Sequence, residues 1–131
     1  MNRTPVNPWQ WSLNFGFDQA ELLDGSRRQL VCSGQASVDG DGNPQHAGDM
    51  AAQVALTIDN LEAVLTAGGM SLANLVQVTI YTTDVDGLLE QFGALAERLA
   101  GGGARFASTL VGVTRLAFPE LLVEISANAV D

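Results

Sequence analysis

The chain has 131 residues, and a hydrophobic fraction of 47% with 16% charged residues is typical of one globular domain spanning residues 1–131. Fifteen acidic residues against six basic ones give a net charge of −9, which opposes binding to the phosphates of nucleic acid. All six bases are arginines, so a lysine Schiff base and a Walker-type phosphate loop are excluded.

The sequence also limits membrane, disulfide and metal chemistry. No apolar run approaches the about 18 residues of a membrane span, and residues 1–5 do not lead into an apolar signal core. Cys32 is the single cysteine and cannot form an internal disulfide, which suits a reducing compartment. His46 is the single histidine, so one chain cannot build a multi-histidine metal site. We expect a cytoplasmic protein with no membrane or nucleic-acid partner, no metal and no cofactor.

Aromatic and other apolar side chains alternate with polar or small ones over residues 9–17. This period of two predicts an extended first strand, in which Trp9 and Trp11 pack in the core or an interface, or stack on a ligand. Asp24-Gly25-Ser26 is typical of a hairpin turn, and residues 29–33 are predicted to form the second strand.

Residues 39–44 read Asp-Gly-Asp-Gly-Asn-Pro and imitate the start of a calcium-binding loop. Pro44 stands where such a loop requires glycine, and Met50 stands where it requires glutamate. We therefore interpret this segment as an ordinary turn-rich loop.

Two amphipathic helices follow. The first is predicted to begin after the capping residue Asp49 and to end at Gly68-Gly69. Its apolar stripe consists of Val54, Ile58, Leu61 and Leu65. The second is predicted to begin after Asp86 and to end at residues 101–103, which are three glycines. Its stripe has the same spacing and consists of Leu88, Phe92, Leu95 and Leu99.

Three further strands are predicted, over residues 75–82, 108–116 and 121–128. Pro119 lies between the last two and suits a turn, because it cannot donate a ladder hydrogen bond. Alternation along the last strand places Glu124 on the face opposite to its apolar residues. A carboxylate in so apolar a strand indicates either a solvated face or a functional site.

The resulting order is ββαβαββ, which predicts an α+β fold with both helices on one face of a mixed sheet. The uncovered face would remain half apolar. Since such a face is an association surface, we expect a homo-oligomer.

Several segments resemble the Rid family, also called YjgF or L-PSP. They are Ser33-Gly34-Gln35, residues 48–61, Val78-Thr79-Ile80-Tyr81 with Asp84, and Val111-Gly112-Val113 continuing to Val123-Glu124-Ile125. The resemblance covers roughly residues 15–130 in consistent order and spacing. It implies a chorismate-mutase-like fold, a homotrimer, and small-molecule clefts at the subunit interfaces.

The resemblance also implies a site. Glu124 and the backbone turn at Ser33-Gly34 match the family's pattern, with Glu124 as the catalytic residue that activates water. The arginine with which the deaminase branch binds the substrate carboxylate is replaced by Ser108. A hydroxyl offers one neutral hydrogen bond where a guanidinium offers two charge-assisted ones, a difference of ~2–4 kcal/mol. The implied activity on 2-imino acids is therefore weak or absent.

The family's tyrosine and asparagine are replaced by Phe17 and Phe92, which makes the implied cleft more apolar and favours a less charged ligand. Arg105 and Arg115 lie three residues before and seven residues after Ser108. Both separations are odd, so neither arginine is expected to replace the missing one on the same face of the strand.

Three functions remain as hypotheses. The first is a hydrolase that converts an imine or enamine to a carbonyl compound and ammonia. The second is a trimeric metabolite-binding protein without catalysis. The third is the ribonuclease or translation-inhibitor role attached to some relatives, which the net charge of −9 disfavours.

Overall fold

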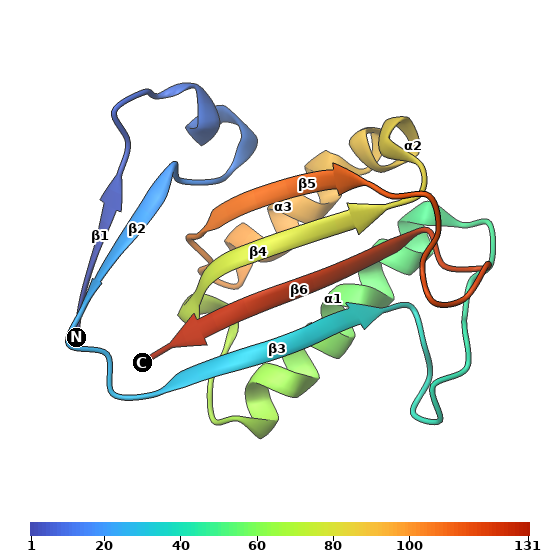
Figure 1. The fold of residues 1–131 in the computed structure, drawn as a ribbon, viewed down its shortest axis with the longest axis horizontal. Coiled ribbons are helices and arrows are strands. Elements are labelled where there is room, and N and C mark those ends of the chain that lie inside the picture. The colour runs from blue at the N-terminus through green and yellow to red at the C-terminus, as the bar shows by residue number, and fades with distance from the viewer.

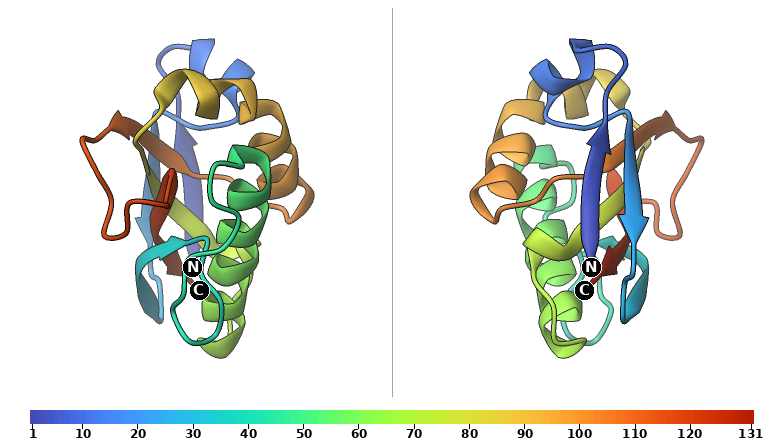
Figure 2. Two further views of the ribbon diagram at one scale, coloured as in Figure 1. Left: turned by 90° about the vertical axis from the view of Figure 1, so that its right-hand side faces the viewer. Right: turned by 90° about the vertical axis from the view of Figure 1, so that its left-hand side faces the viewer.

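A computed structural model describes the whole chain, Met1–Asp131 (Figure 1). Its main sheet has four strands in the order β3–β6–β4–β5, and only the β4–β5 pair is parallel. Their bounds are β3 (Gln29–Ala36), β4 (Leu75–Thr82), β5 (Ala107–Gly112) and β6 (Val123–Val130). Helices α1 (Met50–Ala67) and α3 (Phe92–Gly101) cover one face of this sheet, as Figure 2 shows. The prediction of an α+β fold with helices on one face of a mixed sheet is confirmed.

Helix α1 forms as its local sequence predicts. The Asp49 carboxylate accepts a hydrogen bond from the Ala52 amide at 3.0 Å, which satisfies one of the free N–H groups of the first turn. The helix ends before Gly68, and the positive φ of 75° at Gly69 suits a residue without Cβ. The predicted apolar stripe is buried against β3 and β6 and consists of Val54, Ile58, Leu61 and Leu65.

The second helical region differs from the prediction in its start and continuity. It comprises α2 (Val85–Glu90) and α3, which are interrupted at Gln91. The cap is Asp84, whose carboxylate accepts from the Gly87 amide at 3.0 Å, so the prediction of Asp86 was wrong. Asp86 lies in the first turn instead, where its negative charge is favourable near the helix N-terminus.

The N-terminal region is the largest departure from the prediction. The aromatic segment is not a strand, because Trp11–Phe15 form the 3-10 helix η1, which ends at Gly16 with φ of 80°. It connects β1 (Asn2–Val6) to β2 (Ala20–Asp24), and these strands form a separate antiparallel pair. Asp24-Gly25-Ser26 is therefore a connection between two sheets, not a hairpin turn. Three strands precede α1, where two were expected.

The last two strands are present with altered bounds, since β5 ends at Gly112 and β6 begins at Val123. The apolar face predicted for the last strand is buried and consists of Leu121, Val123, Ile125 and Ala127. The opposite face of the sheet is not covered by helices (Figure 2). Thr79 and Tyr81 are half-buried on it, and Val31 is exposed. No helix is both long enough and apolar enough to cross a membrane.

Candidate functional site

A cavity of about 560 Å³ lies on the helix side of the sheet, at the edge formed by β5. We call it the aromatic pocket; it is lined by Trp11, Phe15, Phe17, Val85, Leu89, Phe92, Ser108 and Leu110. Seven of these eight residues are hydrophobic, and Ser108 is the single polar residue among them. A concave apolar cavity with few polar groups is the usual form of a small-molecule site.

The strand register explains why Ser108 points into this pocket. Ser108 is paired with Val78 and Leu110 with Ile80, and both partners are buried in the core under the helices. Paired residues project to the same face of a sheet, so Ser108 also projects to the helix side. Phe92 also lines the pocket and is the first residue of α3, directly after the interruption of the helical region at Gln91.

Three aromatic residues from the N-terminal region complete the pocket, and we call them the aromatic wall: Trp11, Phe15 and Phe17. The Trp11 ring lies edge-on to Phe17 at 5.8 Å and to Phe15 at 6.4 Å, in favourable aromatic geometry. Trp11 is nevertheless 54% exposed and Phe15 55% exposed. Clustered exposed aromatic side chains indicate a binding surface. In Figure 1 the 3-10 helix that carries Trp11 and Phe15 and the helix α2 lie along the same edge of the main sheet, the one formed by β5.

Glu124 lies on the other face of the sheet. It is paired with Tyr81 in β4 and Ala36 in β3, and Tyr81 in turn is paired with Val111 in β5. Tyr81 lies three residues after Val78 in β4, and Val111 lies three residues after Ser108 in β5. Because side chains alternate between the two faces, Tyr81 and its partner Glu124 project away from the helices. The six predicted site residues therefore form two groups. Phe17, Phe92 and Ser108 line the aromatic pocket, whereas Ser33, Gly34 and Glu124 lie together elsewhere.

The group around Glu124 is close-packed. A Cβ atom added at Gly34 would lie 2.3 Å from the Glu124 carboxylate oxygen Oε1. Gly34 also lies where the register of β3 shifts against β6, between Cys32 and Gln35. The glycine thus allows the carboxylate to lie directly against the β3 backbone, beside the exposed Ser33.

Replacing Gly34 by alanine is expected to displace the Glu124 carboxylate while leaving the fold intact. The clash is with the end of a flexible side chain, and the backbone at Gly34 does not have a positive φ. We expect any activity that depends on Glu124 to fall at least tenfold, with the unfolding midpoint nearly unchanged. Gly40→Ala is the matched control, since a Cβ there would meet no atom within 4 Å. Equal activity of both variants would show that the position of Glu124 is unimportant.

Neither arginine near Ser108 reaches the aromatic pocket. Arg105 donates to the Asp18 carboxylate through Nε at 2.7 Å and Nη2 at 3.1 Å. Arg115 is exposed in the loop after β5. The pocket lining contains no charged side chain.

Other candidate residues have structural surroundings. Cys32 is buried in the core, and burial raises the pKa of its thiol. His46 lies before α1, and its carbonyl accepts a hydrogen bond from Gln53. The loop at residues 39–44 is closed by Asp39, whose carboxylate accepts from the Asp41 and Asn43 amides, as expected for a turn. No group of three or more His, Cys, Asp or Glu side chains is placed to hold a metal ion.

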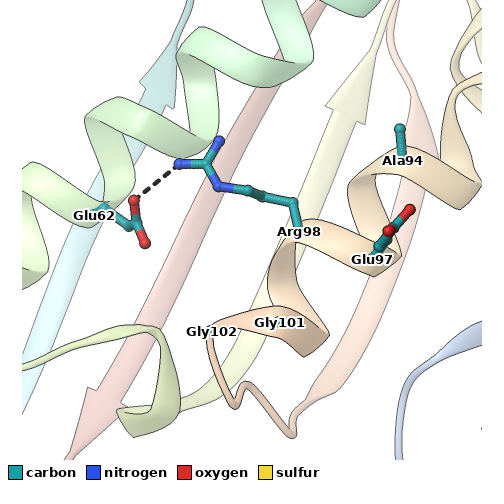
Figure 3. A pocket seen from close by; sticks show the side chains of 6 residues that line it. All are labelled: Glu62, Ala94, Glu97, Arg98, Gly101 and Gly102. Carbon is teal, nitrogen blue, oxygen red and sulfur yellow. Dashed lines mark hydrogen bonds and ion pairs between the residues drawn. The ribbon is translucent and has the colours of Figure 1, made fainter.

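A second hollow of about 570 Å³ lies between α1 and α3 (Figure 3). Its lining is mostly polar or small and consists of Glu62, Ala94, Glu97, Arg98, Gly101 and Gly102. The Arg98 guanidinium is already paired, with Glu62 at 2.8 Å and Asp59 at 2.6 Å. This hollow therefore offers a ligand few free binding groups, and we do not assign it a function.

Of the residues that line the aromatic pocket, Trp11 was considered from the sequence as a side chain that could stack on a ligand, whereas four were not predicted as site residues: Phe15, Val85, Leu89 and Leu110. The sequence interpretation also missed two buried acids at the base of the N-terminal region, Asp18 and Glu21, whose side chains are 1% and 4% exposed. The density of aromatic residues over 9–17 was the signal for the pocket. The sequence around Asp18 and Glu21 gives no sign that they are buried, because a solvent-exposed turn commonly contains the same residue types.

Comparisons with known proteins show the family of the chain. The family described as Endoribonuclease L-PSP matches residues 20–131. The chain is 40% identical over 87 residues to mmf2, a mitochondrial protein of Schizosaccharomyces pombe, covering 66% of this chain and 64% of that one. This chain thus matches slightly less than two thirds of the length of mmf2. It is 32% identical over 99 residues to the RutC family protein YjgH of Escherichia coli, covering 76% and 74%.

Among solved structures, the chain is similar to YyfB from Yersinia pestis, a protein of unknown function in the conserved Rid family. The two share 31% identity and superpose with a TM-score of 0.86 over 99% of each chain. Together with the family match to residues 20–131, this likeness establishes that the chain belongs to the Rid, or YjgF/L-PSP, family.

Proposed function

We propose that the chain provides a Rid-type small-molecule site that hydrolyses an imine or enamine to a carbonyl compound and ammonia, with weak or absent activity on ordinary 2-imino acids. The observation that carries this proposal is the lining of the aromatic pocket, which contains Ser108 and no charged residue. A 2-imino acid brings a carboxylate, and an anion without a cationic partner in an apolar cavity is strongly disfavoured. An imine with an apolar substituent and no carboxylate suits the same cavity.

We further propose that the complete site combines two copies of the chain in a homotrimer. Ser108 and Glu124 project to opposite faces of one sheet, so one chain cannot place both against the same ligand. In the proposed assembly, the aromatic pocket of one copy faces the Glu124 group of the next. The uncovered sheet face supports this arrangement, because it leaves apolar and half-buried groups for a partner to cover.

In the proposed reaction, water adds to the C=N carbon of the imine. Glu124 accepts a proton from that water, and the proton is then delivered to the nitrogen. In the second step the hydroxyl proton of the carbinolamine is transferred through Glu124 to the nitrogen, the C–N bond breaks to release ammonia, and the hydroxyl oxygen becomes the carbonyl. The pocket holds the substituent, and the carboxylate acts as general base and then as general acid.

Glu124→Gln is the test. An amine oxidase acting on benzylamine or phenethylamine supplies an imine with an aromatic substituent, and ammonia release is followed in a coupled assay. We expect the wild-type chain to accelerate release over buffer, and Glu124→Gln to lose about 10²–10⁴-fold of that acceleration, the usual contribution of a general acid–base group. Equal acceleration by wild type and variant would contradict the proposal.

Binding without catalysis is the second candidate. The aromatic pocket favours this candidate, because its lining contains no acidic or basic side chain that could transfer a proton to or from a ligand. Saturable binding of a neutral aromatic ligand with no ammonia release from any imine would support this candidate over hydrolysis. Ribonuclease activity is disfavoured by the net charge of −9, and salt-sensitive RNA binding by the purified protein would reverse that conclusion.

A further inference from the structure

The aromatic wall is carried by a region that is only loosely joined to the main sheet. Strands β1 and β2 pair with each other and not with the four-stranded sheet, and in Figure 1 they stand apart from it at the start of β5. Backbone contact along β5 is limited to a single bridge between Asp18 and Ala107, with the Asp18 amide donating to the Phe106 carbonyl at 2.8 Å. The position of the aromatic wall therefore depends on side-chain attachments.

Two arginines supply most of these attachments. Arg3, on β1, donates to the carbonyl groups of Ala73 and Leu75, each at 2.8 Å, and to that of Arg105. Arg105 in turn donates two hydrogen bonds to the Asp18 carboxylate, which is 1% exposed. Asn7 donates to the same carboxylate at 2.7 Å. Asp18 is thus a well-satisfied buried anion.

Glu21, on β2, lies beside this anion without comparable partners. Its side chain is 4% exposed, its oxygen Oε1 accepts no hydrogen bond, and the closest guanidinium nitrogen, Nη2 of Arg3, is 3.9 Å away. The charged groups that face it are Arg3 from β1, Asp18 from the turn before β2, and Arg105 from the segment before β5. Arg3 and Arg105 direct their hydrogen bonds to other groups.

The pKa values of the two carboxyl groups are therefore shifted in opposite directions. Burial, followed by the interaction with the neighbouring Asp18 carboxyl group, raises the pKa of Glu21 to about 7. Burial also acts to raise the pKa of Asp18, but hydrogen bonds from Arg105 and Asn7 outweigh it and hold that pKa below its ordinary value. At pH 6 the two carboxyl groups therefore hold one proton between them, and at pH 8 both are charged.

We propose that Asp18 and Glu21 are positioning residues for the aromatic pocket: this buried pair keeps the aromatic wall against β5 while Glu21 is neutral, and it releases the wall when Glu21 is charged. Two adjacent buried carboxylates repel each other, and each would gain by becoming solvated. The single backbone bridge makes separation of residues 1–24 from β5 a smaller change than unfolding of the main sheet. Only the ligand-binding part of this inference rests on the proposed function.

The direction of the pH dependence follows from the pKa of Glu21. A raised carboxyl pKa means that the docked state binds its proton more tightly than the released state does. The contribution of Glu21 to docking is therefore greatest below its ordinary carboxyl pKa of 4.5 and weakens as the pH rises toward and past 7. With one proton involved, the equilibrium changes by at most about tenfold per pH unit.

Hydrogen exchange of the ligand-free protein, followed by mass spectrometry at pH 6 and pH 8, tests the inference without any ligand. After correction for the intrinsic pH dependence of exchange, we expect protection of residues 1–24 to fall about tenfold between these pH values in the wild type. Protection of β4 and β6 should stay constant, which would show that the main sheet is intact. Glu21→Gln copies the neutral acid and cannot ionise, so it should keep full protection at pH 8.

Glu97→Gln is the matched control, because it removes one negative charge from an exposed site on α3. It should retain the wild-type loss of protection. An equal loss in Glu21→Gln and wild type, or no loss in wild type, would overturn the inference.

Binding of the neutral fluorescent probe N-phenyl-1-naphthylamine separates this inference from the proposed site. We expect the probe to bind several times more tightly at pH 6 than at pH 8 in wild type, and equally at both in Glu21→Gln. Absence of binding at either pH, together with the expected exchange results, would support the role of the acid pair and contradict the proposed site. Binding that is independent of pH in the wild type would contradict the link between the pair and the pocket.

Discussion

Replacing Gln53 by leucine is expected to lower the free energy of unfolding by about 3 kcal/mol. The Gln53 side chain, in the first turn of α1, is fully buried. It makes three hydrogen bonds to backbone groups that lie outside the helix. Its Nε2 donates to the carbonyl groups of His46 at 3.1 Å and Glu120 at 2.8 Å, and its Oε1 accepts from the Leu122 amide at 2.8 Å. Leucine has a similar volume but leaves these backbone groups without their partner, each at a cost of ~1–3 kcal/mol where water cannot reach.

Urea denaturation followed by circular dichroism measures this effect. Gln91→Leu is the control, because Gln91 lies between α2 and α3 and its side chain does not cap the helix. We expect that variant to change the unfolding free energy by less than about 0.5 kcal/mol. If both variants lost the same amount, the loss would reflect the leucine side chain and not the three hydrogen bonds.

Gln53 also connects the fold to the candidate site. Its partners Glu120 and Leu122 belong to the loop that enters β6, and Glu124 is the second residue of that strand. Thr82 at the end of β4 adds a hydrogen bond to the Leu122 carbonyl at 2.7 Å. The register of β6, and with it the face on which Glu124 lies, is therefore fixed at this point by buried polar contacts.

The elements that were predicted correctly are those whose signals are local. The Asp49 cap, the four-residue apolar stripe of α1 and the glycines after it all lie within one helix, and β4 is a run of β-branched and apolar residues with the observed bounds Leu75–Thr82. The start of α2 was predicted two residues too late, because Asp84 and Asp86 are both acceptable capping residues. The choice between them depends on where β4 ends, which is not a local property.

The N-terminal region could not be predicted from periodicity. Alternating aromatic residues fit a strand, yet residues 11–15 form a 3-10 helix whose rings meet each other and the edge of β5. The strands that flank it pair with each other, and Pro5 within β1 weakens the strand signal. Partner choice between strands is set by contacts distant in sequence, such as those of Arg3 with Ala73 and Leu75.

The sequence supplied candidate site residues but not their arrangement in space. The resemblance implied Phe17, Phe92, Ser108, Glu124 and the Ser33-Gly34 turn, and the structure gathers them into two groups on different faces of the sheet. Placing Ser108 and Glu124 relative to each other requires the register of β5 on β4 and of β4 on β6. A single sequence does not contain that register, because each strand alone is compatible with either face.

Replacing Ser108 by arginine is expected to raise the affinity of the chain for a carboxylate ligand about 100-fold, or about 3 kcal/mol. The side chain at position 108 projects into the aromatic pocket, where an arginine would place a bidentate donor in a cavity with no other charge. The aromatic rings of the wall provide flat surfaces on which a guanidinium can stack. Calorimetric titration with 2-oxobutanoate, a stable carboxylate analogue of a 2-imino acid, measures the gain.

Two variants distinguish the geometry of the pocket from charge alone. Ser108→Lys supplies the same charge without the planar fork, so its gain should be clearly smaller than that of arginine. Thr109→Arg places the guanidinium one residue along β5, on the opposite face of the sheet, and should give little gain. An equal gain from Thr109→Arg would show that the reduced net charge, and not the aromatic pocket, attracts the anion. If Ser108→Arg bound no more tightly than wild type, the loss of the arginine could not explain a preference for uncharged ligands.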